Sequence, residues 1–137
     1  MTAKELSQYR SLKKEIEELT SEINVLDGYS VVKGSTSDFP YIMHNIKIQT
    51  SSFRTEEMNR LKKQRLRCRE ERQKISDFIE SIADSELRRI FRYRYFDGLS
   101  WQAVAMKIGE HDESYPRRKH NKFLKNMQSY SSKQKHG

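Results

Sequence analysis

The sequence predicts a mainly α-helical fold, in which a long antiparallel helical hairpin precedes a compact unit of three short helices. Two stretches carry apolar residues with a period of seven, which is typical of helices that pair along a narrow seam. Hydrophobic and charged residues each make up 34% of the chain, which favours long solvated helices over a thick core. Residues that start and stop helices recur at short intervals between positions 84 and 127.

The first expected helix covers residues 4–26. Its apolar residues form two interleaved rows with a period of seven: Tyr9, Ile16 and Ile23, and between them Leu12, Leu19 and Leu26. Asp27 and Gly28 end the pattern. Three heptads are too short to be stable alone, so this coiled-coil seam needs a partner in the same chain or in another copy.

Residues 28–53 are expected to form an insert between two helices. The segment contains Gly28, Gly34 and Pro40 and two short β-prone runs, SVV at 30–32 and NIKI at 45–48. Because connections between helices usually span two to eight residues, an insert of this length is either functional or mobile. A small β-hairpin and a flexible loop are the two alternatives.

The second long helix is expected from about Thr55 to Ile82. Its apolar row has again a period of seven and consists of Leu61, Cys68, Ile75 and Ile82. The complementary row is mostly polar, so this helix can pack on the first through a narrow seam only. We therefore expect residues 1–82 to form an antiparallel hairpin that serves as an oligomerisation arm, most simply of a homodimer. Cys68, the one cysteine, is expected to be a buried structural thiol.

Residues 83–128 are expected to form three short helices, over 85–96, 101–108 and 115–127. The expected caps are Asp84, Ser100 and Ser114, and the expected stops are Gly98 and Gly109. Pro116 falls in the first turn of the third helix, where it removes no helical hydrogen bond. This spacing predicts a trihelical helix-turn-helix. The remaining residues, 129–137, are expected to form a disordered basic tail.

The third of these helices divides into two faces. An inward stripe consists of His120, Phe123, Leu124 and Met127, and an outward stripe consists of Tyr115, Arg117, Arg118, Asn121, Lys122 and Lys125. Arginine can bind both acceptors of guanine, asparagine pairs with adenine, and lysine contacts phosphates. No acidic residue follows position 113. We therefore favour a DNA-reading face over an ordinary solvated one.

The positive charge of the chain is concentrated near its C-terminus. Residues 1–84 carry 15 Lys and Arg against 14 Asp and Glu, whereas residues 85–137 carry 12 against 5. Such a field attracts a polyanion, because binding releases the counterions condensed on its phosphates. A membrane partner is not expected, since no apolar run approaches the roughly 18 residues of a spanning helix and no signal or lipidation motif is found.

A family resemblance supports the same interpretation. The run RRIFRYRYFDGLSWQAVAMKIGE resembles region 4 of sigma-70 factors, with an arginine–tyrosine pair, an acidic residue before glycine, a Ser-capped helix and a closing Ile-Gly. The run SYPRRKHNKFLKNM is similar to the recognition helix of that region, although Pro116 and His120 stand where the family usually has apolar residues. The layout of the whole chain resembles phage-encoded regulators of the ArpU and RinA type.

These resemblances imply a sequence-specific regulator of late phage or prophage genes, which binds double-stranded DNA in the cytoplasm of a bacterial host. The residues expected to contact DNA are Ser100, Trp101, Lys107, Ser114, Tyr115, Arg117, Arg118, Lys119, Asn121, Lys122 and Lys125. Two alternatives remain open: a small terminase subunit for DNA packaging, and an interaction protein that binds host RNA polymerase through the insert.

No catalytic residue, metal site or cofactor is expected. The sequence has no Gly-rich phosphate loop and no nucleophile beside a base motif, so we do not expect an enzyme. The four histidines, at positions 44, 111, 120 and 136, lack the spacing of metal ligands.

Overall fold

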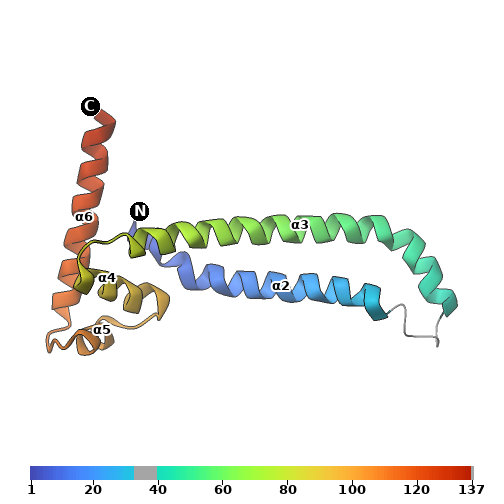
Figure 1. The fold of residues 1–137 in the computed structure, drawn as a ribbon, viewed down its shortest axis with the longest axis horizontal. Helices are drawn as coiled ribbons and strands as arrows, with labels where there is room; N and C mark the ends of the chain where they lie inside the picture. The colour runs from blue at the N-terminus through green and yellow to red at the C-terminus, as the bar shows by residue number, and fades with distance from the viewer. Residues whose placement is uncertain (33–39, 137) are drawn as a thin grey trace. The chain divides into compact units, whose positions relative to one another are not determined.

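The computed structural model describes the backbone of residues 1–32 and 40–136, and the side chains of residues 1–28 and 52–129 (Figure 1). The fold is mainly α-helical, as the sequence predicts. The chain divides into two compact units: an arm unit, Lys13–Glu70, and a terminal unit, Met1–Leu12 with Glu71–Gly137. The two chain ends therefore belong to the same unit.

The described residues form seven helical elements. They are α1 (Ala3–Leu6), α2 (Gln8–Val32), α3 (Pro40–Glu80), α4 (Ser85–Phe91), the π-helix η1 (Arg92–Phe96), α5 (Trp101–Ile108) and α6 (Ser114–His136). The helix expected over 85–96 is thus continuous, but its last five residues adopt the wider π-helical turn. Residues 129–136, expected as a disordered tail, continue α6, and Gly137 lies outside the described residues.

The β-hairpin predicted for the insert at 28–53 is not found in the described part of that segment. The SVV run lies at the end of α2 and the NIKI run lies inside α3. Residues 33–39 lie outside the described residues. The β-prone runs are helical because each extends a long neighbouring helix, and adding a residue to an existing helix avoids the cost of nucleation.

In the arm unit, the period-seven rows become the buried side of each helix. Ile16, Leu19, Ile23, Leu61 and Cys68 are each at most 8% exposed. Across the seam, the Gln64 amide and the Cys68 thiol donate to the Glu15 carboxylate, so that α2 and α3 lie side by side in this unit (Figure 1). The predicted burial of Cys68 is confirmed.

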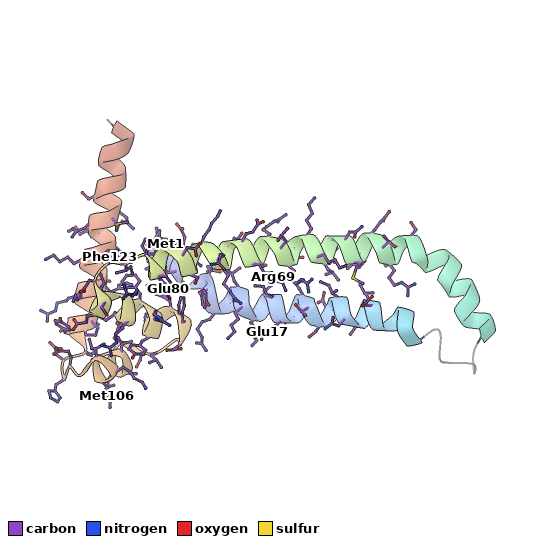
Figure 2. The ribbon with its side chains drawn as sticks, in the orientation of Figure 1. Met1, Glu17, Arg69, Glu80, Met106 and Phe123 are labelled. Carbon is purple, nitrogen blue, oxygen red and sulfur yellow. The ribbon has the colours of Figure 1, made fainter. Side chains whose placement is uncertain are left out.

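The terminal unit has an aromatic core centred on Phe91, which is fully buried. Its ring contacts those of Phe78, Tyr95, His120 and Phe123, with centroids 4.8 to 6.4 Å apart. Phe123, labelled in Figure 2, brings α6 onto this core. Contacts of this number and size make the helices α4, η1, α5 and α6 one packed body.

Most of the helix ends predicted for residues 84–109 are confirmed. The side chain of Asp84 accepts from the Leu87 N–H at 3.2 Å and caps α4, and the Ser100 hydroxyl accepts from the Ala103 N–H at 3.2 Å and caps α5. Gly109 ends α5 with a φ of 82°, a left-handed conformation that favours glycine. Two ends predicted for the long helices are wrong, because α2 continues through Asp27 and Gly28 to Val32, and α3 begins at Pro40 instead of near Thr55.

The start of α6 differs from the prediction. Ser114 is the first residue of the helix rather than its cap, and both its N–H and its hydroxyl donate to the Asp112 carboxylate, at 3.0 and 2.8 Å. A carboxylate is the stronger acceptor because its bonds are charge-assisted. These two bonds hold the pKa of Asp112 below its usual range.

Candidate nucleic-acid interface

The inward face of α6 fixes which of its residues can meet a partner. Pro116, His120 and Leu124 follow one another at intervals of four, and all three are buried. Figure 1 shows α4 and α5 against the first half of α6, whose second half extends beyond them. Met127, predicted to face inward, is therefore 39% exposed.

Five of the predicted DNA-binding residues lie together on the opposite face of α6. These residues are Arg117, Arg118, Asn121, Lys122 and Lys125, and all are exposed. Their spacing of one, four, five and eight positions places them on a single stripe of an α-helix. We call this set the exposed stripe.

The two arginines of the exposed stripe have weak partners at or just before the start of α6. Arg117 lies 4.0 Å from Glu113, and Arg118 lies 3.6 Å from Asp112. The side chain of Arg117 is 47% exposed and that of Arg118 is 70% exposed. Ion pairs this exposed contribute little to stability, so both guanidinium groups can exchange their carboxylate for a phosphate or a base.

Tyr115 and Lys119, which we also predicted to contact DNA, are engaged within the fold. The Tyr115 hydroxyl donates to Glu86 at 2.6 Å, and the Lys119 ammonium lies 2.9 Å from Asp84 and 3.0 Å from Glu86. Both carboxylates belong to the start of α4. The four side chains form what we call the acidic latch, because they tie the first turns of α6 to α4.

The acidic latch shifts the pKa of each of its members in the direction that strengthens it. Bonds from Tyr115 and Lys119 hold the pKa of Glu86 below its usual range. The pKa of Lys119 is raised, first by its bond to Asp84 and then by Glu86. The bond to Glu86 raises the pKa of the Tyr115 hydroxyl. The Lys119 ammonium is thus charged, and the carboxylates of Asp84 and Glu86 balance its charge.

A buried hydrogen-bond chain reaches the exposed stripe from the core. The Tyr95 hydroxyl lies 2.6 Å from His120 Nε2, and His120 Nδ1 lies 2.9 Å from Asn121 Oδ1. An amide oxygen can only accept, so this assignment places the imidazole proton on Nδ1 and makes Nε2 the acceptor for Tyr95. Burial lowers the pKa of His120 and raises that of Tyr95 to about 12. A neutral His120 therefore orients the Asn121 amide through this hydrogen bond.

The remaining predicted residues are distributed along α5 and the turn after it. The Ser100 hydroxyl caps α5, and the Ser114 hydroxyl donates to Asp112. Trp101 packs between Arg94, 4.5 Å from its ring centre, and His120, 4.9 Å away. Lys107 is exposed near the other end of α5, about 9 Å from Trp101 along the helix axis. The structure therefore places Trp101, and not Lys107, beside the start of the exposed stripe.

An open groove of about 740 Å³ adjoins the exposed stripe within the terminal unit. Its lining includes Trp101, Arg117 and Asn121, and also three cations that the sequence did not indicate: Lys4, Arg10 and Arg94. We had assigned Lys4 and Arg10 to the arm. No local signal marks Arg10, because it reaches the groove against Gly98, 88 positions later in the sequence.

Among residues 1–32 and 40–136, no helix combines the length and apolar composition needed to cross a bilayer. In the same residues, no three His, Cys, Asp or Glu side chains are grouped so that they could hold a metal ion.

Comparisons of the chain with protein families, with curated proteins and with solved structures give no match. The resemblances to sigma-70 region 4 and to the ArpU and RinA regulators therefore stay predictions from sequence. The exposed stripe, the acidic latch and the groove are the features from which a function can be argued.

Proposed function

We propose that this chain is a sequence-specific DNA-binding transcription regulator, encoded by a phage or prophage and acting on late genes in the bacterial cytoplasm. In this proposal α4 to α6 form a trihelical helix-turn-helix, and α6 is its recognition helix. The observation that carries the proposal is the exposed stripe, since five DNA-compatible side chains share one exposed face of α6.

The geometry around the stripe supports a helix-turn-helix. The eight-residue α5 ends at a left-handed glycine, and five residues, 109–113, connect it to α6. In such motifs the N-terminal turns of the second helix contact base edges. Arg117, Arg118 and Asn121 occupy these turns, whereas Lys122 and Lys125 follow them. We therefore assign base contacts to the first three residues and phosphate contacts to the two lysines.

The arm has a separate role in this proposal. The antiparallel helical hairpin of the arm unit, Lys13–Glu70, would join two copies, so that two recognition helices reach adjacent major grooves. Light scattering on the full chain tests this part, because a dimer or tetramer is expected of a regulator. A ring of many copies would instead favour the alternative of a small terminase subunit.

The DNA-reading role can be tested by selecting a binding sequence from random duplexes and measuring the affinity of variants. Arg117→Ala and Arg118→Ala should each cost roughly 1 to 3 kcal/mol of binding to the selected sequence, while Lys125→Ala should weaken all sequences alike. Arg69→Ala, an exposed change on α3, is the matched control and should have no effect. The proposal is wrong if the chain selects no sequence, or if the α6 variants bind as the control does.

A further inference from the structure

The groove beside the exposed stripe is lined by cations from both ends of the chain. Lys4 and Arg10 come from the N-terminal segment, Arg94 comes from η1, and Arg117 comes from α6. None of the lining residues is acidic. The four charges therefore repel one another across a shared hollow, which an anion would relieve.

Three of these cations have no acidic partner in the described part of the chain. Lys4 and Arg10 are exposed, and neither forms an ion pair with a described carboxylate. Arg94 donates one N–H to the Leu99 carbonyl at 2.9 Å and stacks on Trp101. An arginine has five N–H donors, so most of those on Arg94 remain for a ligand.

The N-terminal segment is anchored at the groove by packing within the terminal unit. Leu6 is fully buried, and the ring of Tyr9 lies 4.4 Å from that of Phe96. The Arg10 guanidinium lies so close to Gly98 that any Cβ at that position would collide with it. Lys4 and Arg10 are therefore placed at the groove by buried apolar contacts and by a glycine, since no salt bridge positions them.

The shape of the groove favours an extended anion over a small one. The groove is open, and its volume of about 740 Å³ far exceeds that of one phosphate. It is also continuous with the exposed stripe, because Arg117 and Asn121 belong to both. A ligand that contacts the stripe would thus run directly into the groove. The phosphodiester backbone of duplex DNA is an extended polyanion of this kind.

We infer that the groove is a clamp for the DNA backbone, in which Lys4 and Arg10 grip phosphates flanking the bases read by α6. The inference rests on the proposed function and adds to it a second DNA-contacting segment, residues 4–10, outside the helix-turn-helix. Contacts of this type position the protein on the duplex and carry no sequence information themselves.

The test compares two variants of the full chain that lose the same charges. Lys4→Gln with Arg10→Gln removes one lysine and one arginine from the groove, and Lys63→Gln with Arg67→Gln removes the same pair from exposed positions on α3. Binding to a random-sequence duplex is measured by fluorescence anisotropy over a range of salt concentrations. The slope of log K against log salt should fall by about 1.8 in the groove variant, from roughly 0.9 per lost contact. It should stay unchanged in the control.

Trp101 gives a second readout from the groove itself. It is the only tryptophan in the chain and it lines the groove, so its fluorescence reports occupancy directly. The duplex should change this fluorescence in the natural chain, and the change should be at least halved in the groove variant. Inorganic phosphate at the same ionic strength should change it little, because it cannot bridge the cations.

The possible results separate the inference from the proposed function. Equal salt slopes in the two double variants, with a lower slope in Lys125→Gln, would overturn the clamp and leave the recognition helix intact. Saturating fluorescence change with inorganic phosphate alone would also overturn the clamp, because the groove would then be a small-anion site. No binding of any duplex by the natural chain would overturn both.

Discussion

The two flanks of α6 carry the same kinds of side chain and yet differ in what lies beside them. On one flank, Lys119 meets two carboxylates, Asp84 and Glu86, within 3.0 Å. On the other, Arg117 borders a groove whose lining contains three further cations and no acid. The positions are two residues apart in sequence. The cation of the first flank is paired within the fold, whereas the groove beside the second flank is lined without any carboxylate.

It follows that the role of a basic residue on α6 cannot be assigned from its identity alone. Lys119 and Lys122 are one turn apart, and only the neighbours supplied by α4 distinguish them. A cation held by two carboxylates positions the helix, whereas an exposed cation without one retains its charge for binding. Substitutions that act on one flank at a time can test this division.

The largest effect is expected at Gly98, which lines the groove and has a φ of 68°. Gly98→Ala should lower the free energy of unfolding by about 1 to 2 kcal/mol, because an L-residue is strained in this conformation. Its new Cβ also collides with the Arg10 guanidinium. We therefore also expect weaker binding to random duplexes. Fluorescence anisotropy measures the binding, and denaturant unfolding measures the stability.

Gly109 provides the matched control for this substitution. Its φ of 82° is equally unfavourable for alanine, but a Cβ there meets nothing within 4 Å. Gly109→Ala should therefore cost a similar backbone strain without displacing Arg10. If both variants bound random duplexes equally once corrected for the fraction folded, the contact between Arg10 and Gly98 would have no part in binding.

A smaller effect should separate the two lysines. Lys119→Met removes the cation of the acidic latch, and we expect it to lower the free energy of unfolding by at most about 1 kcal/mol, since the pair is partly exposed. Lys122→Met should leave unfolding unchanged and weaken duplex binding, with a salt slope lower by about 0.9. Denaturant unfolding and anisotropy on both variants give the two readouts. The opposite pattern would reverse the roles assigned to the two flanks.

Local signals in the sequence were sufficient to predict much of the terminal unit. Asp84, Ser100 and Gly109 bound their helices as expected, because capping depends on a few adjacent residues. The burial of His120 also follows from its spacing with Leu124 on one helix face. The β-hairpin predicted from the SVV and NIKI runs was wrong, because the β preference of three or four residues is overridden when a long helix can continue through them.

The acidic latch and the place of Arg10 at the groove could not be predicted, because both depend on contacts distant in sequence. Glu86 lies 33 positions before Lys119, and the sequence around Lys119 gives no sign that a carboxylate will pair with it. Arg10 reaches Gly98 from the opposite end of the chain. Periodicity shows which face of a helix is polar, but the role of a polar side chain is set by what the tertiary fold places against it.

The smallest effect concerns the buried histidine that supports Asn121. In the unfolded chain an imidazole gains its proton near pH 6.5, whereas burial lowers the pKa of His120 in the fold. Below about pH 6.5 the unfolded chain therefore binds more protons than the folded chain, so stability falls as the pH falls through this window. Glu86 and Asp84 also have lowered pKa values, but their contributions are lost only as the pH falls through the ordinary carboxyl range and below it.

His120→Gln isolates this effect, because glutamine can accept from Tyr95 and donate to Asn121 without titrating. We expect the variant to be less stable near neutral pH, because the glutamine side chain fits the aromatic core less well than imidazole. Its free energy of unfolding should also depend less on pH between about 6.5 and 5. Unfolding by denaturant at several pH values measures both. His111→Gln, at an exposed position, should keep the natural slope. If His120→Gln kept it too, protonation of the histidine behind Asn121 would not limit stability, and the neutral hydrogen-bond chain would be the wrong description of how the core orients the stripe.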